Sequence, residues 1–383
     1  MELIKDSSEL KQLCNEFSKS RYVTVDTEFI RETTFWPKLC LIQLAMPGKE
    51  ALIDPLADGL DLSPFYALMT NRDVIKVMHG CRQDIEIFYY LAKIIPEPLA
   101  DTQVMGMVCG FGDAAGYETL VRKVANTGID KGSRFTDWSM RPLSDKQTAY
   151  ALADVTHLRD IFEKLEATVN ESGRQSWLAE EMAILTNPET HEQKPENAWK
   201  RLRFQDKRAR VMGVITEVSA WREIQAQKRN IPRNRILKDD AIREIALQGP
   251  KDETALDKLR GVPNGFIRSR NAAGLMDAIR KGQKANKEDL PPLPAPVDNR
   301  PGIGPLVELL KVLLKHVCET HGVAPKLIAN VADLERIASD DAPAVKALGG
   351  WRREVFGDSA MALKNGKLAI GCRDDKVILI ENS

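Results

Sequence analysis

Short apolar runs alternate with helical patterns over the first 170 residues or so. Runs rich in β-branched and aromatic residues are typical of strands. We expect strands at residues 22–28, 39–45, 51–53, 74–79 and 98–101, and helices at 83–93, 117–125 and 144–166, with Ser144 as the N-cap of the last. The first three strands follow one another through short turns, as in an antiparallel meander, and helices separate the later ones. This order predicts a mixed β-sheet with helices on its faces.

Beyond residue 170 the pattern becomes almost entirely helical. A proline-rich stretch, in which four prolines fall between residues 291 and 296, is typical of an extended linker. Further helical patterns at 304–320, 325–339 and 342–356 lead to an end that is strand-like or irregular. We therefore divide the chain into an α/β domain at 1–190, a helical domain at 191–283, a linker at 284–300 and a second helical domain at 301–383.

Composition places the chain among soluble globular proteins of more than one domain, with 383 residues, 43% hydrophobic and 29% charged. No apolar run has the length of a membrane span, and the first residues lack the features of a signal peptide. The six cysteines lie far apart without a C-x-x-C pair, which argues against a zinc site or a disulfide framework. We expect a cytoplasmic protein, and nothing in the sequence demands more than a monomer.

The formal net charge of zero hides an asymmetry. Residues 194–280 hold 20 Lys and Arg against 11 Asp and Glu, a local net charge of +9, so the remainder carries −9. A basic part joined to an acidic one suggests that one holds a polyanion while the other concentrates carboxylates. The alternative is a solvated, lysine-rich helical surface.

Acidic residues interrupt the pattern at three places. Asp26 and Glu28 end an apolar strand and share one face of it, because side chains two apart on a strand point the same way. Asp84 follows the strand at 74–79, and Asp154 lies one helical turn after Tyr150. Such carboxylates suit hard divalent cations, magnesium or manganese, which can serve phosphodiester hydrolysis. The alternative for Asp26 and Glu28 is a strand cap or a pairing with arginine.

Three motifs in this order carry a resemblance: VDTEF at 25–29, HGCRQDIEIF at 79–88 and YALAD at 150–154. They resemble the exonuclease motifs of the DEDD superfamily, in its Y-x-x-x-D subgroup. The stretches at 32–45 and 128–155 are further similar to the bacterial ribonuclease D family. The resemblance covers residues 1 to about 185, and both helical modules more loosely resemble HRDC domains. It implies a ribonuclease H-like mixed-sheet exonuclease domain followed by two helical HRDC-like domains.

The resemblance also implies roles. Asp26 would bridge two metal ions, Glu28 and Asp154 would complete the tighter site, and Asp84 would hold the second ion. Tyr150 would orient the attacking water or help to deprotonate it, a role like that of a general base that depends on geometry. Phe29 would lie beside the terminal base, with a core position as the alternative.

RNA contacts are expected from basic side chains. Lys131 and Arg134 are candidates for phosphate contacts, with solvated charges as the alternative. The turn between helices at 258–270 offers backbone amides beside Arg260, Arg268 and Arg270, which favours phosphate binding.

These features together predict a metal-dependent 3′→5′ exoribonuclease that trims tRNA precursors and releases nucleoside 5′-monophosphates. One alternative is a DNA 3′→5′ exonuclease of proofreading or helicase-associated type, which uses the same residues. Another is a catalytically silent RNA-binding adaptor, against which the intact motifs argue.

Overall fold

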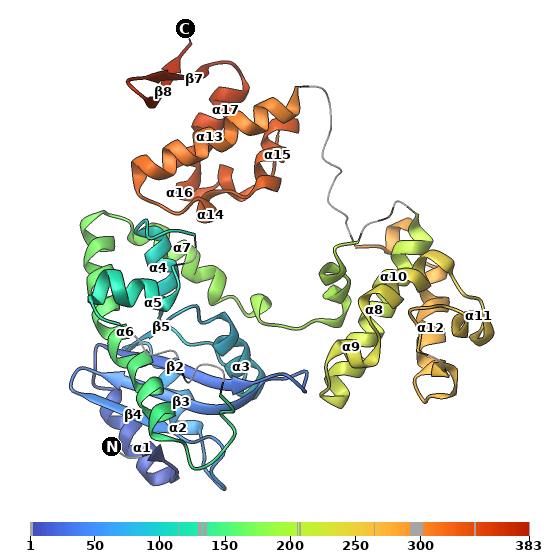
Figure 1. The fold of residues 1–383 in the computed structure, drawn as a ribbon, viewed down its shortest axis with the longest axis horizontal. Coiled ribbons are helices and arrows are strands. Elements are labelled where there is room, and N and C mark those ends of the chain that lie inside the picture. The colour runs from blue at the N-terminus through green and yellow to red at the C-terminus, as the bar shows by residue number, and fades with distance from the viewer. Residues whose placement is uncertain are drawn as a thin grey trace. The chain divides into compact units, whose positions relative to one another are not determined.

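The computed structural model describes residues 3–113, 115–128, 132, 136–204, 206, 208–263, 265–291, 302–340 and 342–382 (Figure 1). The chain forms two compact units. The first, called the sheet unit here, comprises Met1–Glu28, Cys40–Thr190 and Pro296–Ser383. The second, called the basic unit, comprises Phe29–Leu39 and His191–Ala295. Each unit combines segments that are distant in sequence. The division of the chain into consecutive domains at 1–190, 191–283 and 301–383 stays a prediction.

A six-stranded mixed sheet, as expected from the sequence, lies in the order β1-β4-β3-β2-β5-β6. The strands are β1 (Leu3–Ile4), β2 (Tyr22–Ile30), β3 (Lys38–Met46), β4 (Lys49–Ile53), β5 (Ile75–Met78) and β6 (Leu99–Asp101). Strands β3 and β4 are antiparallel, whereas β1 pairs with β4, β2 with β5, and β5 with β6 in parallel. Only β1 was not expected, because two residues are too few to show alternation.

Helices surround this sheet: α1 (Ser7–Phe17), α2 (Ser63–Thr70), α3 (Arg82–Ala92), α4 (Thr102–Val108), α5 (Tyr117–Leu120) with the π-helical turn η1 (Val121–Ala125), α6 (Asp145–Glu171), α7 (Gln175–Leu185) and the turn η2 (Pro188–Thr190). Ser144 is the N-cap of α6 and forms a capping box with Gln147. Leu158 and Phe162 of α6 pack with Tyr22 and Val77 of the sheet in one buried cluster. This packing fixes the long helix along the sheet.

The second helical module contains α13 (Ile303–His321), α14 (Pro325–Ile328), α15 (Val331–Ser339), η6 (Lys346–Leu348), α16 (Gly350–Arg352), η7 (Arg353–Gly357) and α17 (Asp358–Lys364), and it ends in the hairpin β7 (Leu368–Arg373) and β8 (Lys376–Glu381). Asp374 and Asp375 both adopt positive φ, as the two-residue hairpin turn requires. The strand-like end expected from the sequence is thus an antiparallel hairpin.

This module shares a core with the rest of the sheet unit. Met107 and Val108 of α4 belong to the same buried cluster as the apolar side chains of α13 to α17. The rings of Trp177 and Trp351 stack with centroids 4.3 Å apart and an interplanar angle of 11°. Arg352 is buried and forms ion pairs with Glu180, at 3.2 Å, and with Glu181.

The basic unit is helical: η3 (Pro195–Leu202), α8 (Ala209–Arg229), α9 (Arg233–Ile236), α10 (Asp239–Gln248), α11 (Glu253–Asp257), η4 (Phe266–Arg268), α12 (Ala272–Gln283) and η5 (Lys287–Asp289). Helices α8 and α12 approach closely at two glycines, because a Cβ on Gly213 would lie 2.3 Å from the Gly282 carbonyl oxygen. Phe35 is buried in the core of this unit. Across the described ranges, no helix is long and apolar enough to span a bilayer.

Replacing Arg352 by Met tests the shared core of the sheet unit. We expect a loss of about 3 kcal/mol in the free energy of unfolding. The change removes a buried guanidinium that pairs with partly buried Glu181 and donates to the Leu327 carbonyl at 2.7 Å. The adjacent Arg353→Met is the matched control, since Arg353 pairs with Asp358 at an exposed position and should cost less than about 1 kcal/mol. Urea denaturation measures both variants, and equal effects would contradict a buried role for Arg352.

Candidate active site

The structure brings the five residues of the three motifs to one part of the sheet unit. Asp26 and Glu28 lie near the end of β2, and Asp84 lies in the first turn of α3. Tyr150 and Asp154 lie one turn apart on α6. A cavity of about 390 Å³ is lined by Asp26, Tyr150 and Asp154 among others.

Electrostatics show that the four carboxylates are close neighbours. Burial raises the pKa of Asp26 well above its usual range, and the charges of Asp84, Asp154 and Glu28 raise it further. Burial likewise raises the pKa of Asp84 to about 7. Burial and mutual repulsion therefore disfavour the ionised forms of these carboxylates, and bound protons or a cation would offset this cost.

Two of these carboxylates have hydroxyl partners. The Thr27 hydroxyl donates a hydrogen bond to Asp84 Oδ1, and the Tyr150 hydroxyl is hydrogen-bonded to Asp154. In the part of the chain that the structure describes, no three His, Cys, Asp or Glu side chains converge in ready metal-binding geometry. The chemistry of the donors nevertheless fits a divalent ion, because carboxylate and hydroxyl oxygens are the ligands that hard cations prefer.

Tyr150 is held in a protonated state. Burial and the charge of Asp154 raise the pKa of its hydroxyl above the usual range. Its ring lies 6.0 Å from that of buried Trp138. Trp138 is fixed in turn by Arg141, which donates to the Trp138 carbonyl at 2.9 Å and to both carboxylate oxygens of Asp54. The loop before α6 thus supports the tyrosine.

Two hydroxyls anchor α6 beside the strand that bears Asp26. Thr24 Oγ1 donates to the Val155 carbonyl at 2.8 Å, and the Tyr117 hydroxyl donates to the Asp154 carbonyl at 2.5 Å. Sequence reasoning missed both residues. Thr24 stands two residues before Asp26 and so lies on the same face of β2, which is the pattern that could have revealed it. Tyr117 carries no comparable pattern.

Asp101 fixes the turn that leads to Asp84. Its carboxylate accepts hydrogen bonds from the amides of Gly80 at 3.0 Å and Cys81 at 2.9 Å, and it also caps α4. Asp101 was expected only as a strand end. Its position, directly before a helix, is the capping pattern that sequence reasoning could have used.

The hydrogen bond of His79 suits a structural role, whereas the expected roles of Phe29, Lys131 and Arg134 stay predictions. His79 is hydrogen-bonded to Thr102 Oγ1 at 3.0 Å, as suits a structural role. Phe29 is half-buried and belongs to the basic unit, so its contact with a terminal base stays a prediction. Lys131 and Arg134 lie outside the described residues.

The expected phosphate-binding turn uses some of its amides internally. The amides of Arg260 and Gly261 donate to the Glu244 carboxylate at 3.2 and 2.7 Å. The side chains of Arg260, Arg268 and Arg270 are exposed. Their RNA contacts stay a prediction that rests on side-chain charge alone.

Comparisons with known proteins agree with this architecture. Residues 1–170 match a family described as 3′-5′ exonuclease, and residues 212–279 match the HRDC domain. Membership of this exonuclease group implies dependence on divalent metal ions. The HRDC match lies in the basic unit, so the expectation of a second HRDC domain is not confirmed.

Relatives of known name match over the full length. The chain is 49% identical to ribonuclease D of Nitrobacter hamburgensis, over 100% of both chains, and 48% identical to that of Jannaschia sp., over 99% of both. It resembles the crystal structure of Escherichia coli RNase D, an exoribonuclease involved in structured RNA processing, with a TM-score of 0.81 at 27% identity over 95% of this chain and 98% of that one. The chain therefore belongs to the ribonuclease D family and is a 3′→5′ exoribonuclease.

Proposed function

We propose that this exoribonuclease trims extra nucleotides from the 3′ ends of tRNA precursors with two magnesium or manganese ions and releases nucleoside 5′-monophosphates. The observation that carries the proposal is the mutual repulsion of Asp26, Glu28, Asp84 and Asp154 in one partly buried site. Such a concentration of negative charge costs stability unless cations offset it. The released product follows from attack of water on phosphorus with departure of the 3′ oxygen.

The acids would hold the ions as a set. Asp26 would serve both ions, Glu28 and Asp154 would complete one site, and Asp84 would serve the other. Asp84 and Asp154 are hydrogen-bonded to the hydroxyls of Thr27 and Tyr150, which would hold these two carboxylates in position. Bound divalent ions supply activation of water and stabilisation of the charge on the phosphate and the leaving oxygen.

Tyr150 would act as a neutral hydroxyl. Burial and the nearby carboxylates raise the pKa of this hydroxyl, which keeps the proton on the oxygen at physiological pH in the metal-free site. Its bond to Asp154 places the hydroxyl beside a proposed metal ligand. From there it can orient the attacking water by donating or accepting a hydrogen bond.

Asp154→Asn should abolish turnover while RNA binding persists, since the change removes one proposed ligand charge and keeps the shape of the side chain. We expect a loss of about 100-fold or more in the rate of shortening a tRNA with extra 3′ residues. Asp160→Asn is the matched control, because Asp160 is exposed on the same helix. Wild-type activity in Asp154→Asn would refute the assignment.

Tyr150→Phe removes only the hydroxyl and keeps the ring beside Trp138. We expect kcat to fall about 100-fold with little change in RNA affinity, because orientation of the water is lost. Single-turnover rates and RNA binding by anisotropy separate the two effects. A variant with weaker RNA binding and an unchanged rate would assign Tyr150 to substrate binding instead.

Metal binding should strengthen as pH rises through about 7. Below that pH Asp84 holds a proton in the folded protein, and Asp26, whose pKa is also raised by burial, acts in the same direction. In the unfolded chain both groups are ionised above about pH 4. The metal-free protein thus loses stability as pH rises from about 4 to 7, and a cation offsets this loss.

The measurement is the rise in Tm on adding Mn²⁺ at about pH 6 and pH 8, with a larger rise expected at pH 8. Asp84→Asn should reduce the difference, because it removes one titrating carboxyl. Equal rises at both pH values in the wild-type protein would argue against carboxylate ligands of raised pKa.

A further inference from the structure

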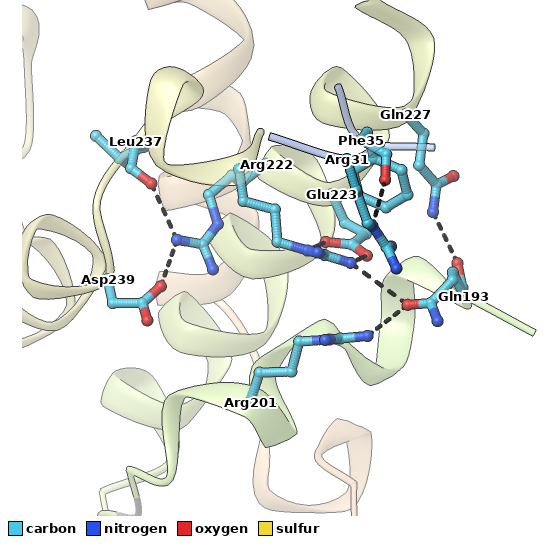
Figure 2. A network of polar contacts seen from close by, with 10 residues as sticks. Arg31, Phe35, Gln193, Arg201, Arg222, Glu223, Gln227, Leu237 and Asp239 are labelled. Atoms are coloured by element: carbon cyan, nitrogen blue, oxygen red, sulfur yellow. Dashed lines mark hydrogen bonds and ion pairs between the residues drawn. The ribbon is translucent and has the colours of Figure 1, made fainter. Parts of the chain in front are cut away.

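A further polar cavity lies within the basic unit, and its lining does not include the turn at residues 258–270. Its volume is about 310 Å³, and its lining includes four arginines and one acid: Arg31, Arg201, Arg222, Arg233 and Asp239. Arg31 comes from the segment 29–39, and the others come from η3, α8, α9 and α10. In Figure 2 the side chain of Arg201 reaches Gln193, whereas Arg222 reaches Asp239 and the Leu237 carbonyl.

Arg222 is the buried centre of this cavity, with 1% of its surface exposed. Its Nη1 atom donates to the Leu237 carbonyl at 2.9 Å and to Asp239 Oδ1 at 2.6 Å (Figure 2). Its buried Nε has no hydrogen-bond partner among the described residues. A buried guanidinium with an unsatisfied N–H is costly unless a further acceptor reaches it.

The neighbouring arginines are held in place by their own contacts. Arg233 forms a bidentate ion pair with Glu223, with both N···O distances 2.6 Å. Its guanidinium carbon lies 4.3 Å from the centroid of the Phe35 ring. Arg201 and Arg233 both donate to Gln193 Oε1. The cavity is therefore built in advance, so an anion that enters it has little ordering of side chains to induce.

Charge and shape favour an anion of tetrahedral form. Four of the lining side chains are arginines, and Arg233 and Arg222 pair with the carboxylates of Glu223 and Asp239. Planar guanidinium groups match phosphate oxygens with paired hydrogen bonds. The unsatisfied Nε–H of buried Arg222 is a donor that such an oxygen could accept from.

We propose that this arginine pocket binds a backbone phosphate of the RNA substrate. The proposal rests on the proposed action on RNA and adds a specific binding site to it. RNA is the favoured source of the phosphate because most of the lining comes from residues 194–280, which carry a net charge of +9. Arg31 stands three residues after Glu28, so the pocket includes a side chain from the segment that continues the acid-bearing strand.

The test measures binding of a 3′-extended tRNA to full-length protein that carries Asp154→Asn to prevent turnover. Arg201→Gln and Arg31→Gln should each weaken binding about fivefold and lower the slope of log K against log salt by about 0.7–0.9, the loss of one phosphate contact. Arg222→Gln should act likewise where circular dichroism shows a folded protein. Arg280→Gln is the matched control, since this exposed arginine on α12 pairs with Asp277 outside the pocket and should change neither quantity.

Unchanged affinity and slope in both Arg201→Gln and Arg31→Gln would overturn the proposal. Inorganic phosphate is a separate probe of the pocket. If phosphate raises the Tm of the wild-type protein but not of Arg201→Gln, while the RNA slope stays unchanged, the pocket takes a free anion and the RNA assignment fails. The salt slope is measured on a protein that does not turn over, and trimming is measured on the wild-type chain. Lack of phosphate binding in the pocket and lack of RNA trimming are therefore observed separately.

Discussion

Repulsion among four carboxylates is the constraint on which the rest of the sheet unit depends. Asp26 sits where burial and the charges of Asp84, Asp154 and Glu28 all disfavour its ionised form. A fold driven by stability alone would not gather acids in this way, because each added charge raises the cost for the others. The fold must hold them against that repulsion, and the surrounding structure shows how it does so.

The restraint comes from bonds to the backbone. The Thr24 and Tyr117 hydroxyls bind carbonyls of α6 next to Asp154, and Asp101 binds the amides that precede α3. Each bond fixes a main-chain segment and leaves the acidic side chain able to change partners. Contacts of this kind to the main chain hold in place the segments that carry the acidic side chains.

The sequence predicted the local placement of the acidic residues better than the contacts that support them. The strand alternation that placed Asp26 with Glu28 and the one-turn spacing of Tyr150 and Asp154 are local patterns, and both survive in the structure. The capping box at Ser144 is local too. In contrast, Tyr117 lies 37 residues from its acceptor at Asp154, and no spacing rule connects them. The two-residue strand β1 and the core shared by Met107 with the last helices also depend on tertiary contacts.

Segment 29–39 packs in the basic unit although it lies within the first 190 residues of the sequence. It continues the strand that carries Asp26 and Glu28, yet Phe35 is buried in the core of the basic unit under the guanidinium of Arg233. The amide of Trp36 donates to Asn230 Oδ1 at 2.9 Å, which also ties the segment to α8. The residues that directly follow the acid-bearing part of β2 therefore pack in the core of the basic unit. The net charge of zero is therefore the sum of a basic region, residues 194–280 at +9, and a remainder at −9 that includes the four carboxylates.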